Sequence, residues 1–589
     1  MIYDARPFDT RLTPARVSAE AATKFPRLAL WGLMVAYVLA GLFGRDPWPQ
    51  DDAAGFGVML SMAQAIGAGD AAAWWLPSVS GQLVADEGPL AFWIGALFLH
   101  ALGPWLGDVT SMRLTCTLWF LVAAAGVWYA TYRLARRDEA QPIAFVFGGE
   151  AHPRDYGRML ADIAVLLLIG TVGIALRIHE TSAEPAALAW FALSLFGLAI
   201  AIDRPLAGAA LAGGALGLWA MTRGVAHAPF ALLAAGGVLW TLCANRRAAA
   251  VAVLATTALA VFSLWPLLSF AFAPESAARF FDLWLTQWRA SYGLPSLSDL
   301  GWIARNLPWY TWPLWPFAGW TLYTWRHGLA APHLRLPASV AVGALVALAL
   351  SDAPSDAALI MLVPPLAVLA AFGAVTLRRG AGDGIDWMAI VLFSLLAFVV
   401  WSYYIAVQTG APVKMAASIE RLTPGFAAPF QPLAVMAAAA ATLGWIALVA
   451  WRVVLRPPVL WRGPLLAAGG TAMLWVVLSG LFLPAVDFNR SYAPLAQRIA
   501  AESTAQAGIN ACFMPHRLSP AHLALFSHFG GLRFARVERG EVCPLALHRD
   551  SRRTLMDDDP PPGDWQLVWE GGWPARPDET MRIYRRLAR

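Results

Sequence analysis

Apolar runs of about 20 residues recur along most of this chain, and they constrain its fold more than any other feature. Hydrophobic residues make up 58% of the 589 residues and charged residues only 14%, whereas soluble globular proteins are about 25% charged. Inside a bilayer the backbone of such a run must satisfy its own hydrogen bonds, which favours α-helices. The sequence therefore predicts a mainly α, polytopic membrane protein.

The runs predict about thirteen transmembrane helices, each roughly as long as a bilayer is thick. They cover residues 28–44, 111–132, 159–176, 185–202, 206–222, 226–243, 249–271, 309–325, 338–351, 356–376, 386–405, 431–451 and 464–484. Residues 1–27 are then a cytoplasmic N-terminal leader, and residues 28–486 form the membrane domain. Arginines gather in the loops that this scheme places inside, in agreement with the positive-inside rule. An odd number of spans puts the C-terminal segment outside.

Two long loops lie outside in this scheme, residues 45–110 and 272–308. The first contains an apolar stretch, 89–103, that is short for a span. Counting it as a span would move the arginine-rich loop 133–158 outside, so we expect a helix that lies at the outer membrane face or dips into it. The second loop is rich in tryptophan, which suits an interfacial helix.

Residues 487–589 differ in character and predict a small soluble α/β domain. An amphipathic helix is followed by short strand-like segments separated by polar and proline-rich turns. Cys512 and Cys543 both fall in this domain, and we expect them to lie close enough to form a disulfide if the domain faces an oxidising compartment. Cys116 and Cys243 fall in apolar segments, where cysteine is usually a packing residue.

Carboxylates are concentrated in the loop 45–110, in a chain that otherwise avoids charge. They are Asp46, Asp51, Asp52, Asp70, Asp86 and Glu87. Each one alone is compatible with a solvated loop residue. Together, at the mouth of the first span, they suggest general bases or a site that positions a cation.

The segment "QDDAAGFGVMLSMAQAIGAGD…WWLPSVSGQLVADEGPLAFWIGALFLHALG…VTSMRL" resembles the first outside loop of the bacterial aminoarabinose transferase and protein O-mannosyltransferase superfamily. These are glycosyltransferases of the GT-C fold. Asp51–Asp52 match the acidic pair of the family, and Gly69–Asp70, "DEGPL" and Arg113 match motifs that follow it. "RIHETSAEPAALAW" is similar to the segment with the second family acid, which corresponds to Glu184, and His179 precedes it. Arg223 stands at a family lysine after a glycine-rich span.

This resemblance implies a sugar transferase at the periplasmic face of a bacterial inner membrane. The donor would be a sugar on a polyprenyl phosphate, and the acceptor a lipid A, an envelope polysaccharide or a protein. Asp51 is the expected base, with Glu184 as its acidic partner and Asp52 beside it. Arg113, Arg223 and Arg305 are the expected donor-phosphate ligands, although Arg113 and Arg223 also suit anchors at span ends. For His179 a hydrogen-bonded interfacial role is favoured.

The chain departs from the family pattern at several positions. Ala54–Gly55 stand where the family has Arg-Tyr, Glu87 replaces a lysine, and Ala358 replaces a tyrosine. The reversed charge at Glu87 predicts that an arginine has taken over the phosphate. The alternative is a divalent cation that bridges Asp86 and Glu87 to it. No other cofactor, no metal-binding motif and no nucleic-acid partner are predicted.

A transporter, or a catalytically silent assembly protein on the same scaffold, is the competing interpretation. A transporter is expected to carry ionisable residues near the bilayer midplane, on broken helices. Here the informative charges lie at span ends and in outside loops, while the span interiors are nearly free of charge. This distribution favours an outward-facing reaction site.

Overall fold

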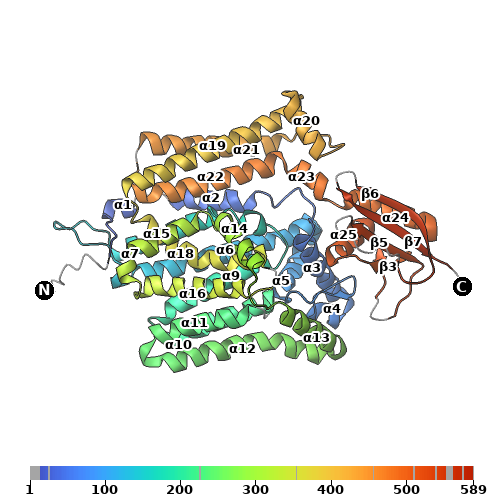
Figure 1. The fold of residues 1–589 in the computed structure, drawn as a ribbon, viewed down its shortest axis with the longest axis horizontal. Coiled ribbons are helices and arrows are strands. Elements are labelled where there is room, and N and C mark those ends of the chain that lie inside the picture. The colour runs from blue at the N-terminus through green and yellow to red at the C-terminus, as the bar shows by residue number, and fades with distance from the viewer. Residues whose placement is uncertain are drawn as a thin grey trace.

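The computed structural model describes residues 13–23, 27–224, 227–352, 354–455, 457–508, 511–536, 540–551, 561–573 and 576–587. Part of the predicted leader, residues 1–12 and 24–26, lies outside these ranges. Long helices run side by side through most of the molecule, and a small sheet lies beyond one end of them (Figure 1). The predicted fold class, a mainly α polytopic membrane protein with a small C-terminal α/β domain, is confirmed.

Nine helical stretches in the described ranges are long and apolar enough to cross a membrane. They are α6 (Asp108–Ala135), α9 (Glu184–Ala201), α10 (Pro205–Arg223), α12 (Arg247–Phe272), α16 (Pro332–Ala349), α17 with α18 (Asp356–Leu359 and Val363–Ala374), α19 (Arg379–Thr409), α21 (Pro432–Val454) and α22 (Val459–Leu481). The other predicted spans coincide with shorter helices: α2 (Arg27–Leu39), α7 (Pro153–Ile169), α11 (Ala228–Leu242) and α15 (Leu314–Thr324). The count of thirteen spans is therefore not confirmed.

The spans pack closely because small residues line their contacts. α9 and α10 meet where a Cβ atom on Gly208 would lie 2.1 Å from the backbone nitrogen of Ala201, and α6 meets α9 where Gly126 faces Ala192. Such approach of two backbones is the main source of helix association in a lipid environment. α19, α21 and α22 form a separate apolar cluster, the upper layer in Figure 1.

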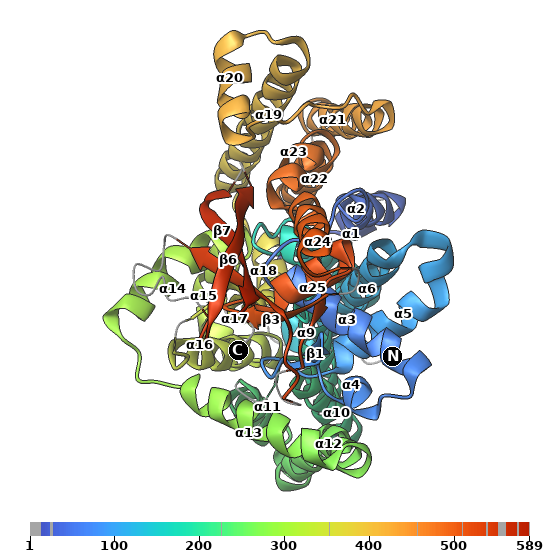
Figure 2. The ribbon, with the colours of Figure 1, turned by 90° about the vertical axis from the view of Figure 1, so that its right-hand side faces the viewer.

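The two predicted outside loops fold into short elements at the end of the bundle nearest the sheet. Residues 45–110 contain α3 (Asp51–Ala68), α4 (Ala71–Trp75), the hairpin β1–β2 (Ser78–Val79 and Gln82–Leu83) and α5 (Leu90–Leu106). The short apolar stretch 89–103 thus forms a helix of its own, α5. Residues 272–308 contain α13 (Pro274–Ala290) and most of α14 (Leu297–Tyr310). In Figure 2, α13 lies lengthwise across the direction of the spans, and it buries the apolar side chains of one face.

The C-terminal domain is a mixed five-stranded sheet with two helices. The helices are α24 (Ala493–Ala507) and α25 (Pro520–Gly530), and the strand order is β4-β3-β5-β7-β6. Strands β3 (Cys512–His516), β4 (Arg533–Phe534) and β5 (Leu545–Ser551) are parallel, while β6 (Trp565–Trp573) and β7 (Arg576–Arg586) add antiparallel pairs. Cys512 and Cys543 form a disulfide, which confirms the expected proximity, and Cys116 and Cys243 are buried and unpaired. Short helices α1 (Ala19–Thr23), α8 (Ile174–Arg177), α20 (Val413–Leu422) and α23 (Leu483–Arg490) complete the chain.

The C-terminal domain is docked on α3 by specific contacts. Gly57 of α3 faces Ala524 of α25 so closely that any side chain at Gly57 would overlap it. The ring of Phe56 contacts that of His528 at 4.9 Å, and the hydroxyl groups of Ser80 and Ser527 lie 2.9 Å apart. The indole nitrogen of Trp48 donates to Asp487 at the start of the domain. The domain is therefore held directly above the acidic loop.

Candidate active site

Asp52 is the centre of a buried ion network that joins α3 to two other parts of the membrane domain. Its carboxylate receives Arg45 Nη1 at 3.2 Å and Arg113 Nη2 at 3.1 Å, and its side chain is 1% exposed. The backbone nitrogens of Trp48 and Thr181, and the hydroxyl of Thr181, donate to the same carboxylate. Burial alone would raise the pKa of Asp52, but Arg113 and Arg45 outweigh it and bring the pKa down to about 2.

Because protein groups enclose Asp52 and Arg113, we propose that both residues support the scaffold, while the catalytic and phosphate-binding roles expected from the sequence stay predictions. Every lone pair of Asp52 faces a donor, so the carboxylate has no position left for a substrate. Arg113 is also 1% exposed and donates to the carbonyl oxygens of Arg45 and Asp46. A guanidinium group enclosed in this way cannot reach a lipid phosphate without breaking the network.

Asp51, the neighbour of Asp52, points into a different and more open cluster. Its carboxylate is 55% exposed and lies 3.1 Å from Arg177 Nη1. Arg177 lies at the end of α8 and contacts three more carboxylates. Its Nη1 is 3.1 Å from Glu180 Oε2, its Nε is 3.6 Å from Glu184 Oε2, and its Nη2 is 3.9 Å from Asp356 Oδ2. One arginine therefore gathers four carboxylates, of which Asp51 and Asp356 come from distant parts of the chain, and Asp51 is the most accessible of the four.

The helix ends explain why these charges meet at this point. Asp51, Glu184 and Asp356 each lie in the first turn of their helices, where a negative charge is stabilised by the helix dipole. Arg177 and Arg223 each lie in the last turn, where a positive charge is stabilised. The packing of α3, α8, α9, α10 and α17 brings these ends to one face of the bundle.

Glu184 is the most unusual group of the cluster. Its side chain is 1% exposed, and neither carboxylate oxygen has a hydrogen-bond partner. The hydroxyl group of Tyr310, which is electrostatically coupled to Glu184, is buried without a partner as well. Buried polar groups are almost always hydrogen-bonded, so unsatisfied ones at a cluster of charges point to a position that a ligand or substrate completes.

Glu87 and Arg223 form an ion pair, the second part of the site. The pair depends on Gly88, whose backbone nitrogen donates to the carbonyl of Thr222 and whose Cβ would overlap Met221 if it had one. Burial raises the pKa of Glu87 to about 7 against the opposing charge of Arg223. Burial also raises the pKa of the neighbouring Asp86, against the opposing effect of the Gln287 side chain on α13.

His179 and Arg305 lie apart from the cluster. His179 is buried, both ring nitrogens face backbone carbonyl oxygens, those of Ala175 and Tyr37, and its ring packs on Trp475. Burial lowers its pKa to about 4, and its position is compatible with the hydrogen-bonded role favoured from the sequence, which stays a prediction. Arg305 is exposed on α14, and its side chain donates to the carbonyl of Gly301.

Sequence reasoning missed Arg177, Glu180 and Asp356. Arg177 and Glu180 stand in the quoted segment "RIHETSAEP", three residues apart, a spacing that places them on one side of a helical turn. The family Arg-Tyr could not fit here, because a Cβ at Gly55 would lie 2.0 Å from the carbonyl oxygen of Thr181. In the described part of the chain, no group of three His, Cys, Asp or Glu side chains is placed to hold a metal ion.

Two crystal structures of ArnT from Cupriavidus metallidurans, one bound to undecaprenyl phosphate and one in the apo state, share this fold. Each gives a TM-score of 0.65 at 17% sequence identity and covers 96% of this chain and 98% of that chain. No family model and no curated protein matches the sequence. The chain is therefore a multi-pass membrane protein of the GT-C fold, as the sequence resemblance implied.

The different environments of Asp51 and Asp52 predict different effects on stability. Asp52→Asn leaves Arg45 and Arg113 buried without their counter-charge, which should cost about 3–5 kcal/mol. Asp51→Asn removes a partly exposed ion pair and should cost less than about 1 kcal/mol. Thermal unfolding of the two purified variants in detergent measures the difference. Equal melting temperatures would contradict the assignment of Asp52 to the scaffold.

The raised pKa of Glu180 predicts that the free energy of unfolding depends on pH. Burial and the charge of Asp52 raise its pKa to about 8 against the opposing charge of Arg177. The folded protein therefore holds a proton that the unfolded chain releases above about pH 4.3, and stability falls as the pH rises toward 8. Relative to wild type, Glu180→Gln should become more stable by about 4 kcal/mol between pH 5 and pH 9. A constant difference in melting temperature across this range would show that Glu180 is already ionised at pH 5.

Proposed function

We propose that this protein is a membrane glycosyltransferase that moves a hexosyl or pentosyl group from a polyprenyl phosphate to an envelope acceptor at the periplasmic face of the inner membrane. The observation that carries the proposal is the open cluster around Arg177. An accessible carboxylate, Asp51, and a buried unsatisfied one, Glu184, face the same arginine, and the arginine of a second ion pair, Arg223, is coupled to both. Such a cluster at the ends of spans suits a reaction between a lipid-borne and a water-borne substrate.

The reaction needs a base and a group that stabilises the departing phosphate. The acceptor hydroxyl attacks the anomeric carbon while its proton passes to Asp51. The bond from the anomeric carbon to the phosphate oxygen breaks, and its electron pair leaves with the polyprenyl phosphate. Arg177 and Arg223 lie where they can stabilise that charge. Glu184 positions Arg177, and Arg305 is left as a contact for the lipid headgroup.

The Glu87–Arg223 pair provides a way to admit the phosphate. Since the pKa of Glu87 is raised to about 7, its carboxyl group can take up a proton near neutral pH. Protonation weakens the pair and frees Arg223 for the phosphate of the donor. This arrangement accounts for a glutamate at a position where the family carries a lysine, and it needs no bridging cation.

An apolar cavity supports a lipid substrate. It has a volume of about 200 Å³ and lies between α15, α19 and α22, with Gly170, Trp312 and Phe317 among its walls. Its outer end adjoins the segment that leads to Arg177, because Val172 and Gly173 hydrogen-bond to the carbonyls of Trp312 and Tyr310. A polyprenyl chain lying there would present its phosphate to the charged cluster. ArnT, which shares the fold, binds undecaprenyl phosphate in one of its crystal structures.

Removal of the base or its acidic partner should abolish transfer without unfolding the protein. We expect Asp51→Asn to reduce transfer by about 10²–10⁴-fold, the usual contribution of general acid–base catalysis, and Glu184→Gln to reduce transfer because Arg177 loses the carboxylate that positions it. Asp282→Asn, an exposed carboxylate on α13, is the matched control and should leave transfer unchanged. The measurement is mass spectrometry of envelope glycans from cells that lack the gene, complemented with each variant.

Two results of this experiment would count against the proposal. An Asp51→Asn variant that restores the glycan fully is not compatible with Asp51 as the base. An envelope that is identical with and without the gene would favour the silent assembly protein instead.

The proposed orientation places the C-terminal domain and its disulfide in the oxidising periplasm. Labelling of intact cells with a membrane-impermeant thiol reagent should modify Cys512 and Cys543 only after reduction, because the two form a disulfide. The buried Cys116 and Cys243 should stay unlabelled in both conditions. If labelling of the reduced pair requires permeabilisation of the inner membrane, the orientation is inverted.

A further inference from the structure

A large polar cavity lies between the C-terminal domain and the outer end of the membrane domain, away from the apolar cavity. Its volume is about 1070 Å³. Residues of α3, α4, the hairpin β1–β2 and α13 form one wall, and residues of α25, β4 and the chain after β4 form the other. The proposed reaction uses none of these side chains.

The lining is rich in groups that hydrogen-bond to hydroxyls. Hydroxyl and amide side chains on both walls face the cavity: Ser61, Gln64, Ser78, Ser80, Ser276 and Ser527. Each of them can both donate and accept a hydrogen bond. Charged groups of both signs are interspersed, Arg279, Arg533 and Arg536 with Asp70, Glu275 and Glu541. A cavity of this chemistry suits a polyhydroxylated ligand and not a lipid chain.

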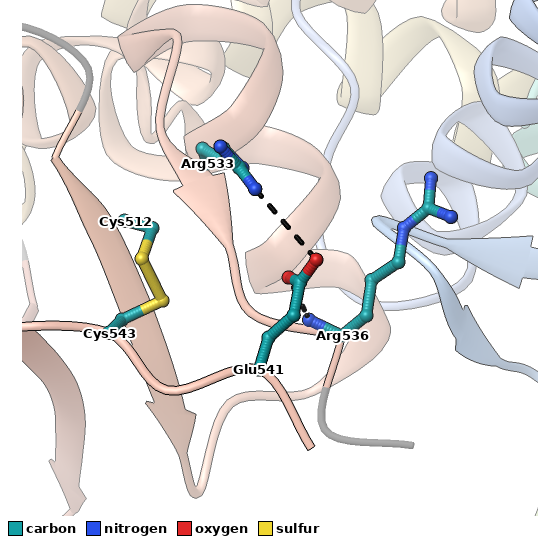
Figure 3. Close-up of a disulfide and its surroundings, with 5 residues drawn as sticks. All are labelled: Cys512, Arg533, Arg536, Glu541 and Cys543. Carbon is teal, nitrogen blue, oxygen red and sulfur yellow. Dashed lines mark hydrogen bonds and ion pairs between the residues drawn. A yellow bond between two sulfur atoms is a disulfide. The ribbon is translucent and has the colours of Figure 1, made fainter. Parts of the chain in front are cut away.

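Among the described lining residues, Arg536 has a guanidinium group that is available to contact a ligand. Its guanidinium group forms no ion pair or hydrogen bond with the described residues, whereas Glu541 receives the backbone nitrogen of Arg536 and lies 3.8 Å from Arg533. Figure 3 shows the side chain of Arg536 extending away from Glu541, toward the membrane domain. There it crosses Gly81, where a Cβ atom would lie 2.9 Å from Arg536 Cγ. The glycine turn of β1–β2 therefore makes room for this arginine.

The Cys512–Cys543 disulfide keeps the arginine in place. Cys512 starts β3, which pairs with β4, and Cys543 follows Glu541 by two residues. The bond thus ties the segment with Glu541 to the strand beside Arg533, and Glu541 in turn holds the backbone of Arg536 (Figure 3). The cavity wall that carries Arg533 and Arg536 therefore lies at an edge of the sheet that the disulfide holds in place.

Three elements connect the cavity to the catalytic cluster. α3 carries Asp51 at one end and lines the cavity from Ser61 onward, about 15 Å along the helix axis. α13 carries Gln287, which acts on the pKa of Asp86, and lines the cavity at Arg279, about 12 Å away along the helix axis. The hairpin β1–β2 lines the cavity just before the chain reaches Asp86 and Glu87.

We propose that this cavity binds the acceptor, and that the acceptor is an acidic glycan whose carboxylate or phosphate is recognised by Arg536. The inference rests on the proposed function and names the class of its acceptor. The chain of sugar rings would lie in the cavity and extend along α3, so that its terminal hydroxyl reaches Asp51. Arg536 supplies an anion contact, and the hydroxyl and amide groups supply the contacts to the rings.

An acidic peptide is the rival occupant, because β4 is an edge strand of the sheet and edge strands can pair with extended peptides. The lining argues against it. Leu532 and Phe534 are themselves buried in the domain, so this edge of the sheet offers a bound strand little apolar surface for its alternate side chains.

The test is calorimetric titration of the purified full-length protein in detergent with hexamers of galacturonate and of mannuronate. Maltohexaose is the neutral control, and hexaglutamate is the peptide control. We expect at least one acidic hexasaccharide to bind, and the two controls to bind at least tenfold more weakly. Arg536→Gln should lower the affinity for the acidic hexasaccharide about tenfold. Gln64→Ala changes an exposed residue, which should not affect folding, and should lower this affinity a few-fold. Arg421→Gln, which lies on α20 away from the cavity, should change nothing.

The Asp51→Asn variant distinguishes a loss of transfer from a loss of binding, because its affinity for the hexasaccharide should equal that of wild type. Binding without any transfer in cells would overturn the proposed function and leave the glycan site standing. No saturable binding of either acidic hexasaccharide at millimolar concentration, equal affinity for hexaglutamate, or equal effects of Arg536→Gln and Arg421→Gln would each overturn the inference.

Discussion

The buried contact of Asp52 with Arg45 and Arg113 is the interaction on which the outer half of the molecule depends. It joins the end of the first span, the start of α3 and the start of α6, and Thr181 adds the loop before α9. Charges removed from water cost several kcal/mol unless they are paired and hydrogen-bonded, and here both arginines pair with the carboxylate of Asp52. The network fixes where α3 starts, and α3 in turn carries the candidate base and the docking surface of the C-terminal domain.

Adjacent residues on α3 have opposite tasks because successive helix positions point in directions about 100° apart. Asp52 faces inward and is held as a carboxylate by two arginines, whereas Asp51 faces the open cluster around Arg177. Glu184 and Glu87 complete the cluster from two other helix ends. The side of α3 that carries Asp52 is held rigidly by arginines, while the Glu184 oxygens on the other side have no hydrogen-bond partner among the described residues. Rigid support beneath a group that can bind a substrate is expected of a functional site.

Much of this architecture could be predicted from the sequence, and the limits have physical reasons. Apolar runs located the helices, yet α2, α7, α11 and α15 are shorter than the length that a span needs, so hydropathy alone does not fix the number of spans. Quoted motifs located Asp51, Glu184, Glu87 and Arg223, and the structure brings these into one electrostatically coupled group. The enclosed positions of Asp52 and Arg113 could not be predicted, because they depend on which side of α3 faces the core. Arg177 and Asp356 were missed because their meeting is a property of packing between distant segments.

The central claim is that the cluster around Arg177 and Arg223 binds the phosphate of a lipid-linked donor. An experimental structure of the protein with a polyprenyl phosphate tests it most directly. The account predicts the phosphate within hydrogen-bonding distance of both Arg177 and Arg223, the Glu87–Arg223 pair opened, and the lipid chain in the apolar cavity beside Trp312. A phosphate bound elsewhere, with Arg223 still paired to Glu87 and Arg177 still enclosed by its four carboxylates, would contradict it.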